Sequence, residues 1–185
     1  MKTKRSRPNA QPKRYITPDR LKFLAERNTT ALENPAAVKL RSKLLRHAGE
    51  EVLLRVMPEE IDRLLTRGEF HSGKGASLRR MQANRCHFNA AKLFLTGQVA
   101  EVVSGFALSE GLWRSHTWVL NSGGQIIETT EPMKVYFGTV LDPREILLEC
   151  VDEELMTDCK SEVARLAAAA GWLVPGWSGY GEGNQ

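Results

Sequence analysis

Helix-like and strand-like patterns of apolar residues follow one another between residues 86 and 130. Residues 86–97 carry apolar side chains at helical spacing and end at a glycine. Residues 99–108 are rich in β-branched residues, and residues 112–121 alternate between two faces as a strand does. Ser122-Gly123-Gly124 is typical of a hairpin turn, which returns residues 125–130 against the second strand. The pattern predicts one helix followed by three strands.

Helical spacing dominates the chain before this segment. We predict helices over residues 17–27, 34–47 and 58–68, because each opens with a capping residue or a proline and continues with an apolar stripe. The apolar residues 52–56 are expected to continue the face of the second helix. The glycine-rich residues 68–77 are predicted to form a mobile connection.

A strand and two helices are predicted after the hairpin. Val135-Tyr136-Phe137 is typical of a strand, Asp142-Pro143 opens a short helix, and residues 155–170 have the spacing of a last amphipathic helix. The sequence therefore predicts an α+β fold with one domain over residues 17–174. Its segments are a disordered basic tail at 1–16, a helical subregion at 17–68, a core at 80–141, C-terminal helices at 142–170 and a flexible tail at 175–185.

Basic residues are concentrated at the start of the chain. Residues 1–14 hold no acidic residue and six basic ones, namely Lys2, Lys4, Arg5, Arg7, Lys13 and Arg14. The net charge of +4 therefore becomes −2 (4 − 6) for the remaining residues, which lack the charge excess typical of a nucleic-acid-binding domain. Two roles stay open for the tail: a solubilising arm, or a contact with an acidic partner.

Cysteine usage and apolar runs narrow the class of protein. No run approaches the roughly 18 apolar residues that a membrane helix requires, so we expect a cytoplasmic protein with no membrane contact. Three cysteines with irregular spacing argue against a disulfide framework. Cys150 and Cys159 lie in apolar contexts and are predicted to be core residues. Cys86 lies at the start of a helix, where the helix dipole and Arg85 would stabilise a thiolate, so it is the candidate nucleophile. Taken alone, this position leaves a core residue open as the alternative.

A histidine and a carboxylate lie on the strands that follow Cys86. His116 lies in the middle of one strand and Glu128 on the returning strand, so a tight hairpin would bring them together. A thiol, an imidazole base and a carboxylate that orients the base form the catalytic group of thiol enzymes. A core histidine with satisfied hydrogen bonds is the alternative for His116, but the nearby cysteine and carboxylate favour catalysis.

A metal site is another possible use of these side chains. Cys86, His87 and His116, with His71, could supply ligands, but adjacent Cys and His rarely bind one ion, and the chain has no C-x-x-C pair. The loop H-S-G-K-G-A-S lacks the spacing of a phosphate-binding loop. We therefore predict no metal and no cofactor, and surface positions for His47 and His71.

Four motifs, R-C-x-x-x-A-A, V-S-G-F-A, H-T-W-V and I-I-E-T-T-E-P, follow one another within residues 80–137. Together they resemble the transglutaminase-like branch of the papain-like thiol enzymes. The resemblance implies a papain-like core, in which the helix carrying Cys86 packs on an antiparallel sheet. It implies Cys86 as nucleophile, His116 as general base and acid, and Glu128 as orienting carboxylate. The family usually has Asp at the third position, so Thr129 and Glu131 stay open as alternatives.

The implied activity is that of a cysteine-dependent hydrolase or acyl transferase, which cleaves amide bonds of a protein or peptide-like substrate through a thioester. The backbone N–H of Cys86 is one candidate oxyanion donor, and the side-chain amides of Gln82 and Asn84 are further candidates. Of Trp113 and Trp118, we expect one in the core and the other on the wall of the substrate cleft. The alternative function is a catalytically inert papain-like fold that binds a protein or a nucleic acid.

Overall fold

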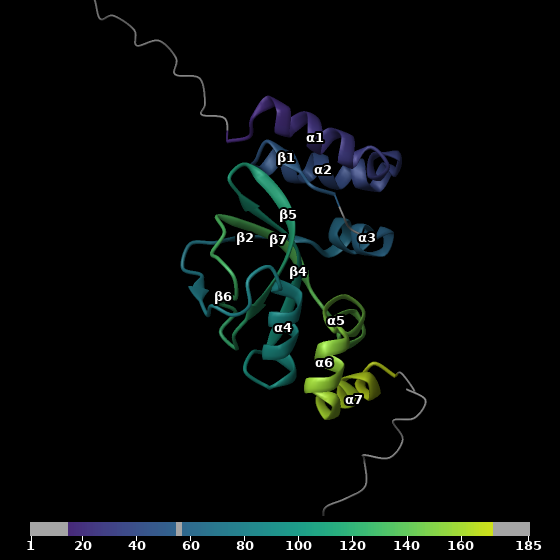
Figure 1. Cartoon of the computed structure of the whole chain (residues 1–185), viewed down its shortest axis with the longest axis vertical. Helices are drawn as coiled ribbons and strands as arrows, with labels where there is room; N and C mark the ends of the chain where they lie inside the picture. Colours follow the sequence, from purple (N-terminus) through teal and green to yellow (C-terminus); the bar gives the residue numbers. More distant parts are fainter. Residues whose placement is uncertain (1–14, 55–56, 172–185) are drawn as a thin grey trace, which may run out of the picture.

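The computed structural model describes residues 15–54 and 57–171 (Figure 1). The helices are α1 (Pro18–Asn28), η1 (a 3-10 helix, Ala31–Glu33), α2 (Pro35–His47), α3 (Pro58–Arg67), α4 (Cys86–Leu95), α5 (Pro143–Cys150), α6 (Glu153–Asp158) and α7 (Lys160–Ala169). The strands are β1 (Glu51–Val52), β2 (Glu69–Ser72), β3 (Ser77–Leu78), β4 (Glu101–Ser109), β5 (Leu112–Leu120), β6 (Ile126–Glu128) and β7 (Val135–Val140). These elements confirm the predicted α+β class.

Side-chain caps begin three of the helices where the sequence predicts. Thr17 Oγ1 accepts a hydrogen bond from a backbone N–H of the first turn of α1, and Asn34 Oδ1 does the same for α2. Asp142 caps α5, and Glu145 bonds back to the N–H of Asp142, which completes a capping box. A proline follows each cap, at the first helical position, where its missing N–H costs nothing.

The strands form one mixed sheet in the order β2-β7-β4-β5-β6-β3, with β1 joined to β5 off this path. The two longest strands, β4 and β5, pair antiparallel along their whole length, and Glu110 and Gly111 make the turn between them with positive φ angles of 48° and 79°. β1 and β3 are parallel to their partners. Figure 1 shows the sheet running between α1 and α2 at one end and α5 to α7 at the other.

The two faces of this sheet are covered differently. On one face, α2 and α3 pack over Phe106 and Trp113, while α4 to α7 pack over Val102 and Val119. The opposite face carries a smaller apolar cluster around Trp118, which is contacted by residues outside the helices. The predicted alternation of β5 is confirmed, because Trp113 and Val119 face α2 to α7 while Trp118 and Leu120 lie on the opposite face. The even-numbered Leu112 packs against α1 at the end of the strand.

One edge of β5 is only partly paired, and this feature positions the site. β4 occupies the other edge from end to end. On the partly paired edge, β1 reaches only Leu112 and Trp113, and β6 reaches only Val119 and Leu120. Residues 114–118 therefore have no strand partner on that side within the described ranges. The backbone N–H and C=O groups of these residues that point away from β4 can therefore form hydrogen bonds with another element that packs against this edge.

Four predictions about local structure are wrong. Residues 52–56 do not continue α2: that helix ends at His47, and β1 follows, although residues 55–56 lie outside the described part. The predicted loop 68–77 contains β2 and the first residue of β3. The single helix predicted over residues 155–170 is in fact two helices, α6 and α7, because the backbone leaves the helical conformation at Cys159 (φ −122°, ψ 40°). Short apolar runs of this kind carry too little periodicity to separate helix from strand.

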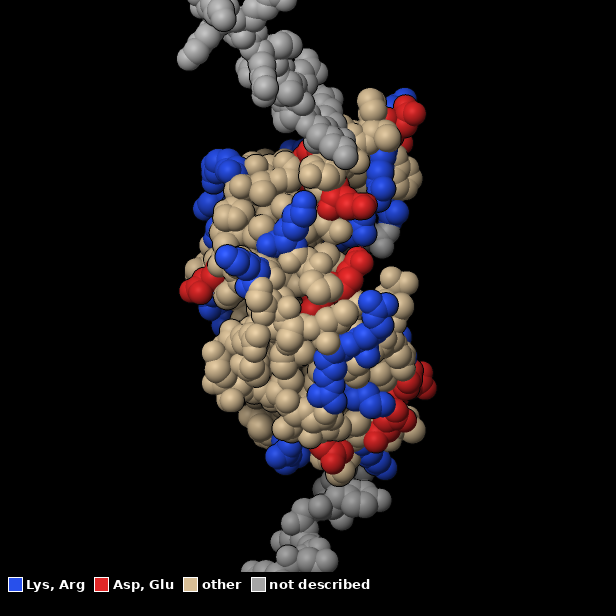
Figure 2. All heavy atoms as spheres, turned by 90° about the vertical axis from the view of Figure 1, so that its left-hand side faces the viewer, with Lys and Arg blue, Asp and Glu red and all other residues tan. Residues whose placement is uncertain are grey.

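The fourth error concerns the end of the basic tail, which we predicted to extend to residue 16. The backbone N–H groups of Tyr15 and Ile16 donate to the carboxylate of Glu50, and the Ile16 side chain is buried. The predicted basic tail up to residue 14 and the predicted C-terminal tail lie outside the described residues. The predicted contact between the basic residues and an acidic partner therefore stays a prediction. Within the described ranges, no helix is long and apolar enough to cross a membrane. Figure 2 shows basic and acidic side chains mixed over one face of the molecule.

Candidate active site

Cys86 is the first residue of α4, as predicted, and its side chain is partly buried. Asn84, two residues earlier, adopts a positive φ of 60°, which turns the chain sharply into the helix. Asparagine is among the few residues that tolerate this left-handed conformation. The first N–H groups of a helix have no partner within it, so the amides around Cys86 are available to its sulfur or to a ligand.

The Cys86 thiol lies at the unpaired stretch of the β5 edge. The backbone N–H of Thr117 donates a hydrogen bond to the sulfur, and so does the backbone N–H of His87. A second contact ties the same two elements together, because His87 Nδ1 and Thr117 Oγ1 are 2.7 Å apart. The first turn of α4 therefore takes the place of a strand partner, which fixes the thiol against β5.

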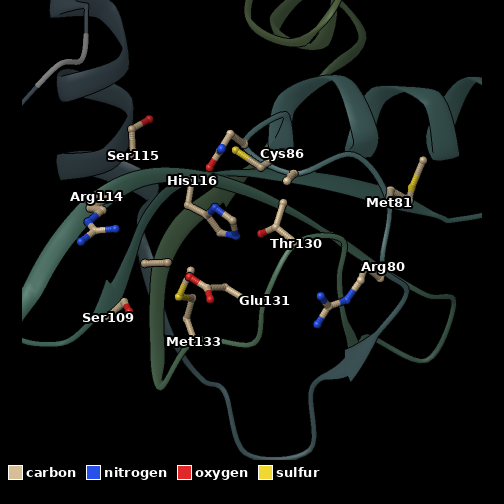
Figure 3. Close-up of a pocket in the computed structure, with 13 residues that line it drawn as sticks. Arg80, Met81, Cys86, Ser109, Arg114, Ser115, His116, Thr130, Glu131 and Met133 are labelled. Atoms are coloured by element: carbon tan, nitrogen blue, oxygen red, sulfur yellow. The ribbon is translucent and has the colours of Figure 1, made fainter.

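His116 projects from the β5 face opposite the helices, and Cys86 reaches it around the open strand edge. The thiol and the imidazole form a hydrogen bond. The other side of the ring is engaged by Glu128 on β6, whose Oε2 lies 2.8 Å from His116 Nε2. Because Nε2 bonds to the carboxylate, Nδ1 is the atom left for the sulfur. Figure 3 shows Cys86 beside His116.

Glu128 is fully buried, and each hydrogen-bond partner of its carboxylate acts as a donor. Oε1 accepts from the N–H groups of Thr129 and Thr130 at 2.8 and 3.0 Å and from the Thr130 hydroxyl at 3.0 Å. Oε2 accepts from His116 and, at 3.1 Å, from the hydroxyl of Tyr136. Burial alone would raise the pKa of Glu128, but the contacts with His116 and the threonine amides outweigh it and lower that pKa.

The charges of the three groups support one another. Burial by itself would lower the pKa of His116, but the hydrogen bonds to Cys86 and Glu128 and their negative charges raise it to about 9. Burial would likewise raise the pKa of the Cys86 thiol, yet the bond to His116, its charge and the two backbone amides lower it. Near neutral pH these directions favour a thiolate and an imidazolium. The coupled titration belongs to the pair and not to either residue alone.

A pocket of about 470 Å³ opens above the thiol and the imidazole. Cys86 and His116 line it, as do Asn84, Arg80, Arg114 and Glu131. Glu128 lies beneath it and has no exposed surface. A small molecule or a side chain that enters this pocket therefore meets the sulfur and the imidazole directly.

The further candidates from the sequence have mixed outcomes. Asn84 lines the pocket beside the nucleophile, but Gln82 does not, because its Oε1 accepts a hydrogen bond from Arg85. The prediction that one tryptophan lines the cleft is wrong. Trp113 and Trp118 are both fully buried, one on each face of the sheet, since this central strand is covered on both sides. The Trp118 ring lies nearly parallel to His116, 6.4 Å away.

Arg85 does not act on the thiol as expected. Its guanidinium forms ion pairs of 2.5 Å with Asp152 and with Glu154, and it lies 3.8 Å over the ring of Phe88. These carboxylates neutralise the charge that we expected to stabilise the thiolate. The imidazole and the two amides supply that stabilisation instead, and Arg85 ties α4 to α6.

The remaining two cysteines and the histidines His47 and His71 do not line the pocket. Cys150 and Cys159 are buried as predicted, and burial raises the pKa of each thiol. His71 lies on β2, half-buried, and not on a loop, while His47 is exposed but stacks on Phe70 at 3.8 Å. Over residues 15–54 and 57–171, no group of three or more His, Cys, Asp or Glu side chains could hold a metal ion.

Three groups in and under the pocket were missed by the sequence interpretation. Tyr136 donates to Glu128, and the alternation of V-Y-F-G-T-V could have indicated that it faces the same side as His116. Arg114 lines the pocket, and its place two residues before His116 on an alternating strand already implied a shared face. Arg80 follows a two-residue strand that carries no periodic signal.

Comparisons of this chain with protein-family models, with curated proteins and with solved structures find no match. The resemblance to the transglutaminase-like enzymes therefore stays a prediction, and the site's function is argued from its geometry.

Proposed function

We propose that this protein is a cysteine-dependent hydrolase or acyl transferase that acts on amide bonds through a thioester intermediate. The observation that carries the proposal is the continuous hydrogen-bonded line from the Cys86 thiol through His116 to the buried Glu128, at the base of an open pocket. A histidine that only stabilises the fold is satisfied by ordinary hydrogen-bond partners. His116 instead lies between a partly exposed thiol and a buried carboxylate that accepts five hydrogen bonds, which is typical of a catalytic group.

The chemistry follows from these three groups. The Cys86 thiolate attacks the carbonyl carbon, and the C=O π electrons move onto oxygen. As the tetrahedral adduct collapses, the C–N bond breaks and the His116 imidazolium gives its proton to the departing amine, which leaves a thioester. Neutral His116 then takes a proton from water or an amine, which attacks the thioester and expels the Cys86 thiolate. Glu128 keeps the imidazole oriented and stabilises its charged form.

The oxyanion would be bound by donors beside the nucleophile. The backbone N–H of Cys86 is at the start of α4 and has no helical partner. The Asn84 side chain lines the same pocket and is the second candidate. A papain-like core, with the helix that carries Cys86 packed on the sheet, belongs to the same proposal. It is supported by the contacts of α4 with β5 and by the order of Cys86, His116 and Glu128 along the chain.

Selective alkylation tests the nucleophile. Iodoacetamide at pH 6 should label Cys86 far faster than Cys150 or Cys159, because the pKa of Cys86 is lowered and those of the other two are raised. Cys159→Ala is the matched control and should leave the labelled fraction unchanged. Equal, slow labelling of all three cysteines would contradict the proposal.

Acyl transfer tests the chemistry. With p-nitrophenyl acetate, an acetyl group should appear on Cys86 by intact mass and should be removed by hydroxylamine, as a thioester is. Cys86→Ala should abolish the acetylation, and His116→Ala should strongly reduce it, with the circular dichroism spectrum retained. A biological effect that persists in Cys86→Ala would instead favour the alternative of a binding module.

A further inference from the structure

Two arginines that line the pocket have no partner within the described part of the chain. Arg114 lies on β5 and is half-buried, and Arg80 follows β3 and is exposed. No hydrogen bond or ion pair connects either guanidinium to a described residue. Figure 3 shows the two on opposite sides of His116.

The absence of a partner is unusual for a half-buried arginine in this protein. Arg41 pairs with Glu51 at 2.7 Å, and Arg85 pairs with Asp152 at 2.5 Å, although about a third of each arginine side chain is exposed. The buried Arg63 pairs with Glu149. A guanidinium that is partly withdrawn from water gains from a carboxylate in bidentate contact. Arg114 is half-buried like these residues but has no such carboxylate.

The position of Arg114 sets where a ligand group would bind. Arg114 and His116 face the same side of β5 two residues apart, which separates them by about 7 Å along the strand. The residue paired with Arg114 on β4 is Ala107, whose small side chain also lines the pocket and leaves space beside the guanidinium. A group bound to Arg114 would therefore lie within a few bonds of a carbonyl at the thiol.

Glu131 decides which kind of anion fits. It lines the same pocket, and Figure 3 shows it between Arg80 and Arg114. Two guanidinium groups and the Glu131 carboxylate give the wall itself a charge of +1, while the thiolate, the imidazolium and the buried Glu128 beneath it together add −1, so the site as a whole carries no large positive excess and the +1 lies on the wall. That charge matches a monoanionic carboxylate better than a dianionic phosphate.

We propose that the substrate carries a carboxylate a few bonds from the reacting carbonyl, and that Arg114 binds it, with Arg80 adding charge from the opposite wall. This inference rests on the proposed function, because it describes the substrate of the same site. A substrate of this class would be an acidic acyl group, such as one from a dicarboxylic acid or from an acidic or C-terminal residue of a peptide.

The experiment compares two alkylating agents that differ in charge. Iodoacetate carries a carboxylate and iodoacetamide does not, and the ratio of their second-order rates at Cys86 reports how the pocket treats a carboxylate. Arg114→Gln should lower this ratio about fivefold, the size expected for one partly screened charge near the reacting atom, and the ratio cancels any change in thiolate reactivity that affects both agents alike. Glu131→Gln should raise it. High salt should shrink both differences.

Two controls isolate the arginine. Arg114→Lys keeps the charge and should keep most of the ratio, which separates a charge effect from a folding defect. Arg79→Gln removes a neighbouring exposed arginine that bonds to Gln98 outside the pocket, and it should leave the ratio unchanged. The charge of His116 affects the rate ratio in every variant. The effect of Arg114 is therefore measured by the difference in this ratio between variants and not by its absolute value.

The outcomes separate this inference from the proposed function. A ratio in Arg114→Gln within twofold of the original would overturn the carboxylate proposal, while fast iodoacetamide labelling of Cys86 would leave the thiol enzyme intact. Slow labelling by both agents would defeat the proposed function itself. Protection of Cys86 by inorganic phosphate that exceeds protection by acetate would overturn the choice of a carboxylate.

Discussion

Replacement of Glu128 by glutamine tests the charge network with little change in shape. The variant keeps one oxygen and exchanges the other for an NH₂ group in a site where five donor groups, on four residues, form hydrogen bonds to the carboxylate. Loss of an opposite charge at hydrogen-bond distance typically shifts a pKa by about 1–3 units. The pKa of His116, raised to about 9, should therefore fall by that amount. Each unit corresponds to about 1.4 kcal/mol.

The pH dependence of Cys86 alkylation measures this shift. In the original protein the thiolate is stabilised by the charged His116, so iodoacetamide should react quickly at pH 6. In Glu128→Gln the pKa of His116 is lower, so the charged imidazolium is less stable and the pKa of the Cys86 thiol rises. The rate at pH 6 should fall about tenfold or more, in line with a shift of at least one unit. Unfolding by urea should also show a loss of about 1–3 kcal/mol, because two donors then face an NH₂ group.

Glu101→Gln is the matched control, since Glu101 is an exposed carboxylate at the start of β4. Its alkylation profile should coincide with that of the original protein. Glu131→Gln addresses the alternative that the neighbouring carboxylate is the third member, and it should shift the profile less than Glu128→Gln does. If Glu128→Gln and the original protein give the same pH–rate curve, the carboxylate does not support the pair and the reasoning is refuted.

Three further predictions concern the same part of the fold. Because the pKa of His116 is raised, its imidazole keeps the proton below about pH 9 and loses it above that pH. An NMR titration of the imidazole should therefore show a midpoint near 9, and Cys86→Ala should lower this midpoint. A midpoint near 6.5 in both proteins would contradict the pairing. Tyr136→Phe removes the oxygen that accepts from Met133 N at 2.9 Å, and it should reduce the free energy of unfolding by about 1–2 kcal/mol in urea. Gly138→Ala would bring a methyl group within 2.6 Å of a backbone oxygen of β4 and of an indole ring of β5, so calorimetry should show a loss of about 2 kcal/mol or more; an unchanged melting temperature would show that the strands can separate there.

The predictable part of the fold had strong periodicity or specific caps. The starts of α1, α2 and α5 followed from Thr17, Asn34 and Asp142, because side-chain capping is a local interaction. The long strands β4 and β5 followed from composition and alternation. Strands of two to four residues, such as β1, β2 and β3, did not, since their pairing depends on distant strands and not on their own pattern.

The candidate site was predictable in its members and not in its geometry. His116 and Glu128 were brought together by a hairpin that the glycine turn indicates. The approach of Cys86 around a strand edge could not be foreseen, because it depends on where β1 and β6 stop pairing. The same holds for Arg85, whose acidic partners come from α6, some 67 residues further along the chain.

The partly paired edge of β5 has a consequence for solubility. An unpaired stretch in a central strand is a template onto which another chain can add its own backbone, which is a common route to aggregation. The first turn of α4 caps that stretch through the sulfur of Cys86 and the His87–Thr117 contact. A change that detaches this turn would therefore expose the unpaired backbone groups of β5 and also move Cys86 away from His116. Loss of thiol reactivity and self-association should then appear together.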